Sequence, residues 1–362
     1  MNIRNIKIRG FRNLKGVDLT FDQAVPIHAF VGPNGQGKTN ILEAIYLCCL
    51  SKSFRTRTGT DLVGFEDDFS SVKIDLDETK LEVILTAKPA QKVLKVNGVK
   101  RSATEFIGHL KAVFFSPDDL AHMSFSPRLR RRYLDVVLSQ LNQDYLIKLM
   151  EYGAAIRQRN ALLKTIREKQ AEVSELDFWD EKLAQLGATI VAKREKLISR
   201  LQTLVSLHYK EISKSDSEIS IVYESEVRGV NGKELLEMYK KNRRRDLAVC
   251  QTHLGPHRDD LQFLLDGKDM AFFASRGEWR SLVLAMKFAE IDLIKEQTGE
   301  DPVLLLDDVF SELDAERQKF LFDAIGKSQT FITTTHKEFI EALPTAHTVY
   351  NVSAGAISSA PA

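Results

Sequence analysis

Cysteine is scarce in this sequence, and neither sign of charge is in excess. Cys48, Cys49 and Cys250 are the only three thiols, and they form no CxxC pair and no disulfide framework. Lysine and arginine together number 51, against 50 aspartate and glutamate residues. This balance excludes a uniformly basic coat for nucleic acid, so any contact with DNA must come from local basic patches.

Long apolar runs are missing as well. Residues 1–11 alternate apolar and polar side chains, which predicts a strand and leaves no apolar segment for a signal peptide. The most apolar stretch elsewhere, near residues 45–50, is far too short to cross a bilayer. Because the chain has three thiols and no export signal, we expect it in the cytoplasm and without a membrane partner.

Two kinds of sequence pattern divide the chain. Short strand-like segments fill the first part and return after residue 217, whereas apolar residues recur at helical spacing over residues 127–173 and 175–208. We therefore expect a mixed α/β lobe interrupted by an all-helical lobe, in which two long helices form an antiparallel hairpin. The predicted ranges are 1–115 and 216–362 for the two halves of the α/β lobe and 116–215 for the helical lobe.

The segment GPNGQGKT, residues 32–39, matches the phosphate-loop pattern in full. Gly35 and Gly37 allow the backbone to turn its N–H groups toward phosphate oxygens. Lys38 supplies positive charge for the β- and γ-phosphates, and Thr39 supplies a hydroxyl for Mg²⁺. A strand precedes the loop and a helix follows it, so the positive end of that helix faces the phosphates. The predicted nucleotide-binding residues are Gly32, Pro33, Asn34, Gly35, Gln36, Gly37, Lys38, Thr39 and Asn40.

Two adjacent carboxylates end an apolar segment far downstream. PVLLLDD, residues 302–308, predicts a buried strand with Asp307 and Asp308 at its carboxyl end, where parallel sheets bind ligands. Asp307 is predicted to hold Mg²⁺, directly or through water. Asp308 follows it on the opposite side of the strand and is predicted to polarise the water that attacks the γ-phosphate.

Two further segments complete an ordered set of motifs. ASRGEWRS, residues 274–281, precedes an amphipathic helix, and Ser275 and Gly277 at its start predict a second anion cradle. Because the phosphate loop of the same chain already holds one triphosphate, this cradle is predicted to serve the triphosphate of a second subunit. After SELD (residues 311–314), the strand-like TFITTT leads to His336, whose imidazole is a candidate contact for the γ-phosphate.

The order of these motifs resembles that of the ABC ATPase superfamily. This resemblance implies an ATPase head that binds ATP and Mg²⁺. It also implies a homodimer in which two heads sandwich two ATP molecules, each held by the phosphate loop of one head and the signature cradle of the other.

Several segments that are not general ABC features resemble the RecF family over essentially the whole chain. They are IKIRGFRNLKGVDLTF near the start, KSFRT (52–56), FFSPDDL (114–120), RRRYLD (130–135), QRNALLK (158–164), LDFWDEKLAQLG (176–187) and THLGPHRDDL (252–261). The sequence departs from the family at Glu278, where Gln is more common, and at Ser126, where Gly usually precedes Pro127.

Membership of this family implies a weak, DNA-dependent ATPase that acts as a switch. Its ATP-loaded dimer would clamp duplex DNA beside single-strand gaps, and slow hydrolysis would release it. The resemblance also implies work with RecR and RecO in loading RecA onto single-stranded DNA coated by single-strand-binding protein. Gap repair, replication restart and SOS induction are the implied processes.

Basic clusters offer candidate contacts for DNA. Charged residues most often form a solvated face, but consecutive arginines on a helix spread over three faces and cannot all serve one row of salt bridges. The candidates are Arg55, Arg57, Arg128, Arg130, Arg131, Arg132, Arg243, Arg244 and Arg245.

Two other function classes compete with this interpretation. An ATPase subunit of a transporter is disfavoured by the long helical insertion and by the lack of a membrane span in this chain. A metal-dependent nuclease would use His253, His257, Asp259 and Asp260. A Gly-Pro pair between the two histidines breaks any helix there, so their spacing does not place both on one helical face.

Overall fold

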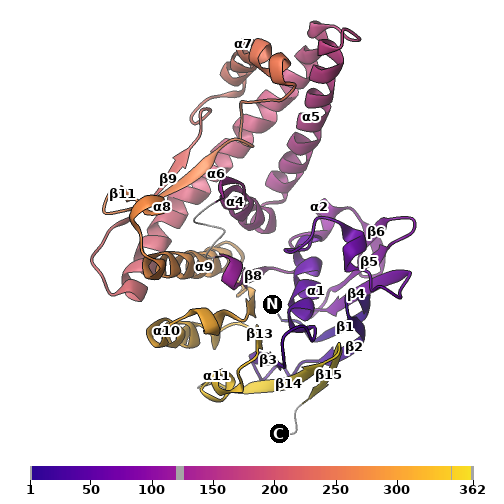
Figure 1. Cartoon of the computed structure of the whole chain (residues 1–362), viewed down its shortest axis with the longest axis vertical. Coiled ribbons are helices and arrows are strands. Elements are labelled where there is room, and N and C mark those ends of the chain that lie inside the picture. Colours follow the sequence, from indigo (N-terminus) through magenta and orange to yellow (C-terminus); the bar gives the residue numbers. More distant parts are fainter. Residues whose placement is uncertain (1, 120–125, 344, 360–362) are drawn as a thin grey trace. The chain divides into compact units, whose positions relative to one another are not determined.

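A computed structural model describes residues 2–119, 126–343 and 345–359 of the chain (Figure 1). Its contacts divide the chain into two compact units. Unit 1 consists of Met1–Ala121 and Arg280–Ala362, and unit 2 of His122–Trp279. Unit 2 extends to Trp279, whereas the predicted helical lobe ended at residue 215. The difference arises because the strands that follow the long helices pack on those helices.

Unit 1 contains two six-stranded sheets. The antiparallel sheet has the order β2-β1-β4-β5-β6-β7, and the mainly parallel sheet has the order β15-β14-β3-β13-β12-β8. The strands are β1 (Asn5–Phe11), β2 (Leu14–Thr20), β3 (Ile27–Val31), β4 (Phe69–Asp75), β5 (Lys80–Thr86), β6 (Gln91–Val96), β7 (Val99–Arg101), β8 (Ala112–Phe115), β12 (Val303–Asp307), β13 (Thr330–Thr334), β14 (His347–Ser353) and β15 (Ala356–Ser359). The helices are α1 (Lys38–Leu50), η1 (Gly59–Leu62), α2 (Ala103–Phe106), η3 (Val309–Glu312), α10 (Ala315–Ile325) and α11 (Lys337–Glu341).

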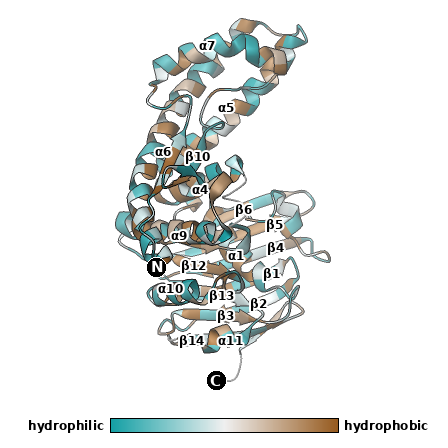
Figure 2. Cartoon of the chain, turned by 60° about the vertical axis from the view of Figure 1, so that its left-hand side comes forward, coloured by the Kyte–Doolittle hydropathy of each residue, from teal (hydrophilic) through white to brown (hydrophobic). Residues whose placement is uncertain are grey.

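The core of unit 1 surrounds the middle strands of the parallel sheet. β3 and β13 are buried along their whole length, and β12 is buried up to its last residue. Parallel strands covered on both faces are apolar rather than alternating, and β12 is largely brown in Figure 2. Helix α1 contacts strands of both sheets and is buried over most of its length, so the start of this helix is held firmly.

Unit 2 combines long helices with a small antiparallel sheet of order β11-β10-β9. Its elements are α4 (Pro127–Leu141), α5 (Gln143–Arg167), η2 (Val173–Glu175), α6 (Leu176–Ser213), β9 (Ile219–Glu224), α7 (Gly232–Val249), β10 (Asp260–Leu265), β11 (Lys268–Asp269) and α8 (Met270–Phe273). Helix α9 (Arg276–Thr298) begins in unit 2 and continues in unit 1. Within the described part of the chain, no helix is both long and apolar enough to cross a bilayer.

The predicted single helix over residues 127–173 is wrong, because the chain forms two helices there. Asn142 separates α4 from α5 with an extended backbone, at φ −140° and ψ 100°. Its side-chain oxygen accepts a hydrogen bond from the Tyr145 backbone N–H at 2.8 Å, which caps the start of α5. The second predicted helix, over residues 175–208, is confirmed as α6.

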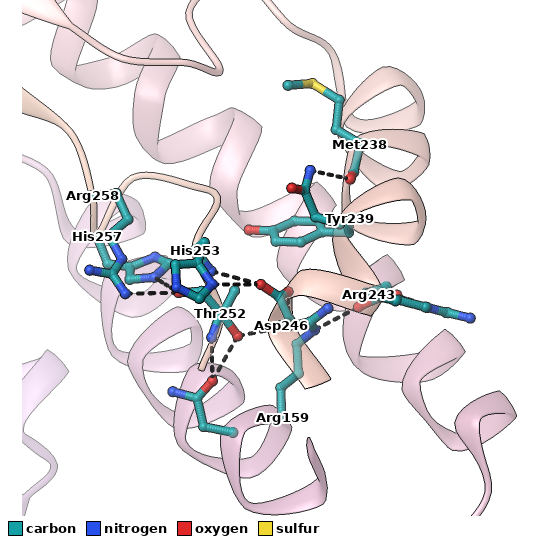
Figure 3. Close-up of polar contacts among 12 residues, drawn as sticks. Arg159, Met238, Tyr239, Arg243, Asp246, Thr252, His253, His257 and Arg258 are labelled. Atoms are coloured by element: carbon teal, nitrogen blue, oxygen red, sulfur yellow. Dashed lines mark hydrogen bonds and ion pairs between the residues drawn. The ribbon is translucent and has the colours of Figure 1, made fainter. Parts of the chain in front are cut away.

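A buried arginine joins the helices of unit 2 (Figure 3). Arg159 of α5 is fully buried. Its guanidinium donates to Asp180 of α6 at 2.7 Å, to Asp246 of α7 at 2.7 Å and to the Thr252 hydroxyl at 2.8 Å. The Tyr239 ring covers it, with 5.5 Å between the guanidinium carbon and the ring centroid. One cation therefore fixes three helices and the loop after α7.

That loop, residues 250–259, carries two histidines that are used within the fold. His257 Nε2 lies 2.9 Å from the Thr252 carbonyl and must donate to it, so His257 Nδ1 accepts from the Tyr152 hydroxyl at 2.9 Å. Burial lowers the pKa of His257 to about 4, so the ring is neutral near pH 7. Gly255 has φ +115°, and a Cβ there would lie 2.4 Å from the Tyr152 hydroxyl.

We predict that Arg159→Met strongly destabilises the protein, whereas Arg157→Met on the exposed side of the same helix does not. Removing Arg159 takes the only described arginine partner from the buried carboxylate of Asp246 and one of two from that of Asp180, and breaking a buried pair typically costs about 3–5 kcal/mol. An exposed substitution should stay within about 0.5 kcal/mol. Urea unfolding followed by helical circular dichroism measures both, and equal midpoints for the two variants would contradict a stabilising role of the network.

Candidate nucleotide site

The phosphate loop joins β3 to α1. Gly35 and Gly37 have φ of +78° and +110°, values that other L-residues rarely adopt. Gly37 is the N-cap residue of α1, so unpaired backbone N–H groups at the start of that helix face the loop. A Cβ on Gly37 would also lie 2.7 Å from the Asn13 side-chain oxygen. The loop therefore has the backbone shape that a bound phosphate requires.

Lys38 reaches back over this loop. Its ammonium donates to the carbonyl oxygens of Gly32 at 2.7 Å and of Pro33 at 2.8 Å. Burial lowers the pKa of Lys38, and the carboxylates of Asp308 and Asp307 oppose that change. Phosphate oxygens accept stronger, charge-assisted hydrogen bonds than these carbonyls do, so an anion in the loop would attract the ammonium.

Asp307 lies at the carboxyl end of β12, beside the loop. One of its oxygens accepts hydrogen bonds from the hydroxyls of Thr39, at 2.7 Å, and Thr333, at 2.6 Å. The parallel register that pairs Asp307 with Thr333 brings these groups together. Thr39 and Asp307 were predicted from their motifs, whereas Thr333 was not, although it lies within the strand-like run TFITTT before His336.

Asp308 directly follows the strand in a left-handed conformation, with φ +51°. Its backbone N–H donates to the Thr333 carbonyl at 3.0 Å. Its Oδ1 is buried and has no hydrogen-bond partner among the described residues. Burial, followed by the charge of Asp307, raises the pKa of Asp308, and Lys38 and His336 act against that rise. Asp308 is thus a carboxylate with an oxygen available to accept a proton or a hydrogen bond.

These groups open into a cleft of about 1280 Å³ in unit 1. The lining includes Lys38, Thr39, Asp307, Asp308, Arg12 and Phe65. The volume is ample for a nucleoside triphosphate, because sites for drug-sized ligands measure roughly 300–1,000 Å³. Polar groups cluster at the loop end of the cleft, where the phosphates would lie.

The remaining predicted residues of the phosphate loop either contact other parts of unit 1 or contribute only their backbone. The Gln36 side chain accepts a hydrogen bond from the Ala354 N–H at 2.6 Å, so it contacts the turn between β14 and β15. Asn40 bridges the side chains of Asn13, at 2.7 Å, and Arg55, at 2.9 Å. Gly32, Pro33 and Asn34 contribute backbone to the loop. His336 precedes α11 with a side chain 57% exposed, and its charge is felt by Asp308.

An ion pair that was not predicted from the sequence lies at the cleft. Arg12 donates to both carboxylate oxygens of Glu43, at 2.7 and 2.8 Å, and Glu43 is fully buried in α1. The Ser53 hydroxyl donates to the same carboxylate. The sequence did contain a signal for this pair, since Glu43 is the only acid in α1 and lies among apolar residues from Ile41 onward. The pairing of Glu43 with Arg12, which lines the cleft, was not evident from the sequence.

Residues 274–279 of the signature segment belong to unit 2, and its last two residues, Arg280 and Ser281, belong to unit 1. Ser275 precedes α9, and its backbone N–H and hydroxyl both donate to one carboxylate oxygen of Glu278, at 2.6 and 2.7 Å. The Glu278 N–H lies 3.3 Å from the Ser275 hydroxyl. This is a reciprocal capping box. Gly277 lies in the first turn of α9, and the Glu278 carboxylate of the same chain accepts both donors of Ser275 at the place predicted for the cradle.

The structure uses several predicted DNA-binding arginines within unit 2. Arg130 forms a two-pronged ion pair with Asp260, and Arg131 donates to the Asp259 carbonyl. Arg243 pairs with Asp177 and Asp180. Three of the nine candidate arginines therefore have partners within unit 2, so their presence is explained without DNA.

The remaining candidates lie mostly at the surface. Arg55 donates to Asn40, while Arg132 also has partners within the fold. Four others are exposed and form no ion pair with any residue that the structure describes: Arg57, Arg128, Arg244 and Arg245.

The nuclease constellation is not assembled. His257 is held by Tyr152 and Thr252, and His253 lies 3.0 Å from Asp246. Asp259 accepts from the Tyr223 hydroxyl, and Asp260 pairs with Arg130. Across the described ranges, no group of three or more His, Cys, Asp or Glu side chains is arranged to hold a metal ion. The Thr252–Leu261 segment is a structural junction of unit 2.

Known proteins resemble this chain over its whole length. The family model for the RecF/RecN/SMC N-terminal domain matches residues 2–358. The DNA replication and repair protein RecF of Lactobacillus johnsonii is 38% identical over 373 residues, covering 99% of each chain. RecF of Streptococcus suis is 37% identical over 368 residues, again covering 99% of each.

Solved structures are also similar to this chain. A structure of the recombination mediator protein RecF with ATP, in the RecFOR pathway, matches with TM-score 0.91 and 33% identity, covering 99% of this chain and 97% of that one. An Smc head domain from Pyrococcus furiosus matches at TM-score 0.55 and 16% identity, covering 99% and 95%, which shows the fold alone. The predicted α/β ATPase-head fold with a helical lobe is confirmed. The chain belongs to the RecF family of DNA replication and repair proteins.

Proposed function

We propose that this chain is an ATP-dependent DNA-binding protein of gap repair, whose ATP-loaded dimer holds DNA and releases it after slow hydrolysis. The observation that carries the proposal is the convergence of the phosphate loop with Asp307 and Asp308 on one cleft of unit 1. A RecF relative that is 33% identical was solved with ATP, which supports the same nucleotide here.

The residues of the cleft fit Mg²⁺ and ATP. Helix α1 directs N–H groups at the loop, and Lys38 supplies the cation for the β- and γ-phosphates. The Thr39 hydroxyl and the Asp307 carboxylate are the hard oxygen ligands that Mg²⁺ prefers, and they already lie 2.7 Å apart. When bound, the metal would neutralise charge on the transferring phosphoryl group.

Asp308 is the proposed partner of the attacking water. Its buried Oδ1 has no other partner in the described part of the chain, and its raised pKa makes it a better proton acceptor. His336 is proposed to donate to the γ-phosphate from the neighbouring strand end. Both groups act on the same phosphoryl group from the carboxyl ends of adjacent strands, β12 and β13.

The signature cradle is proposed to act in trans. Ser275 and Gly277 would bind the γ-phosphate held by the phosphate loop of a second copy, which makes dimer formation dependent on ATP. Because Glu278 now accepts both donors of Ser275, this carboxylate must leave the Ser275 hydroxyl when the phosphate enters. Two anions at one cradle would repel each other.

DNA would bind through the exposed arginines that the fold does not use. Arg244 and Arg245 lie together on α7, and Arg128 lies at the start of α4. Phosphate contacts of this kind position a protein on DNA without reading sequence. We further propose RecR and RecO as partners and RecA loading at single-strand gaps as the outcome. The name of a solved relative places it in the RecFOR pathway, and this supports the proposal.

Two acidic variants should separate metal binding from water activation. Asp308→Asn should bind ATP and dimerise but hydrolyse ATP about 100-fold or more slowly, as expected for a lost general base. Asp307→Asn should instead weaken Mg·ATP binding, seen by titration calorimetry with and without Mg²⁺. Asp323→Asn on the exposed surface of α10 is the matched control. Identical behaviour of the first two variants would contradict the division of roles.

Mixed dimers should test catalysis in trans. Lys38→Met removes the phosphate-loop cation, and Ser275→Arg fills the signature cradle, so neither homodimer has an intact composite site. A heterodimer of the two variants has one site in which Lys38 and Ser275 are both intact. The mixture should therefore recover DNA-stimulated hydrolysis that each variant lacks alone. Strong hydrolysis by monomeric Ser275→Arg protein would rule out catalysis in trans.

Paired arginine substitutions should identify the DNA face. Arg244→Ser with Arg245→Ser should weaken binding to gapped duplex DNA and reduce the slope of log affinity against log salt by about two. Arg157→Ser with Arg167→Ser removes the same charge from the exposed side of α5 and is the control. Equal losses in both double variants would show a general effect of net charge rather than a binding face.

A further inference from the structure

Three aromatic side chains stand out on the surface. Among the described residues, the most exposed large apolar side chains are Phe65, Phe272 and Phe273, at 110%, 81% and 73%, and the next is Phe178 at 63%. Exposed apolar groups that gather at one place mark binding surfaces more often than scattered single residues do. Two of the three are adjacent, and the third lines the nucleotide cleft.

Phe272 and Phe273 are presented by an anchored segment. Helix α8 is fixed at its start by Asp269, whose side chain accepts from the Ala271 N–H at 2.8 Å. The Trp279 indole donates to the Met270 carbonyl at 3.2 Å, and Met270 itself is buried. The two rings are therefore held outward by an ordered turn. Phe273 is two residues before Ser275, which places the two Cα atoms within about 7 Å of each other.

Phe65 is held in a similar way in unit 1. It follows Gly64, whose N–H donates to the Gly10 carbonyl at 2.9 Å, and the Asp67 N–H donates back to the Gly64 carbonyl at 3.0 Å. A Cβ on Gly64 would lie 2.3 Å from the Asp67 carboxylate, so the turn is tight. The ring stands at the rim of the cleft that holds the phosphate loop.

The charges beside these rings are complementary. Asp67 and Asp68 follow Phe65 and are exposed, and neither forms an ion pair with a residue that the structure describes. Lys268 and Arg276 flank the Phe272–Phe273 pair, are exposed, and likewise have no ion-pair partner in the described ranges. Phe65, Asp67 and Asp68 thus form an acidic, aromatic rim in unit 1. Lys268, Phe272, Phe273 and Arg276 form a basic, aromatic ridge in unit 2. Opposite charges across an interface fix its register.

We propose that Phe272 and Phe273 of one copy dock on the Phe65 rim of a second copy when the nucleotide-loaded dimer closes, with Arg276 facing Asp67 and Asp68. This inference rests on the proposed trans placement of Ser275. If Ser275 reaches the phosphates in the partner cleft, its close neighbour Phe273 must lie at the wall of that cleft. By two-fold symmetry the contact occurs twice, so each dimer covers six exposed rings.

The first test uses sedimentation velocity with and without ATP. Phe272→Ser with Phe273→Ser should retain nucleotide binding to a single head but raise the dissociation constant of the ATP-dependent dimer at least about tenfold, a loss of about 1.4 kcal/mol. Phe178→Ser removes a similarly exposed ring from α6 and should leave the dimer unchanged. Because all of these rings are largely exposed, their removal takes little from either core.

The second test uses cross-linking between copies. All three native cysteines are buried, so an introduced surface thiol reacts selectively. A mixture of Phe65→Cys and Phe273→Cys proteins should form a heterodimeric cross-link with a short bis-maleimide only when ATP is present. Nucleotide binding by Phe65→Cys is measured first. Phe178→Cys replaces Phe273→Cys in the control, which should give no cross-link.

The outcomes separate this inference from the proposed function. If wild-type protein does not dimerise with ATP, the proposed dimer itself is wrong. If wild type dimerises but the Phe272 and Phe273 double variant dimerises equally well and no cross-link forms, the dimer stands and the aromatic contact is overturned. Normal dimerisation with a selective loss of DNA binding would assign the ridge to DNA instead and would also overturn the contact.

Discussion

One carboxylate oxygen of Asp307 accepts hydrogen bonds from Thr39 and Thr333, and the site depends on this shared contact. Thr39 and Asp307 are 268 positions apart in the sequence. They meet because β12, β13 and β3 are neighbours in one parallel sheet, so all three carboxyl ends lie on one edge. The phosphate loop, the acidic pair and the strand that leads to His336 thereby form one site.

Unit 2 depends on a different constraint, the pairing of buried charge. Arg159 and Arg194 are both buried, and each binds carboxylates from other elements. Such networks require every partner, because a buried charge left alone is costly. Arg130 pairs with Asp260 and Arg243 with Asp180, so both of these arginines have carboxylate partners within the fold. Arg244 and Arg245, on the exposed side of α7, form no ion pair with any residue that the structure describes.

Contiguous motifs were predictable, and long-range pairings were not. The phosphate loop was evident because its glycines, lysine and threonine are adjacent, and PVLLLDD predicted a strand ending at its carboxylates. The pairing of Arg130 with Asp260 spans 130 positions, so nothing local revealed it. Asn142 was read as part of a helix because its neighbours have helical spacing, but its side chain caps the next helix instead. Glu278 is a visible departure from the family sequence, but its hydrogen bonds with Ser275 became evident only from the fold.

The phosphate loop has its neighbours at the far end of the sequence. β3 pairs with β13 on one side and β14 on the other, and the Gln36 carbonyl accepts from the Gly355 N–H at 3.0 Å. A chain emerging from the ribosome therefore presents residues 32–39 early but cannot enclose them until residue 355 has been released. The loop therefore gains its full set of neighbours only when nearly the whole chain is available to fold, which couples this early motif to the last strands of the sheet.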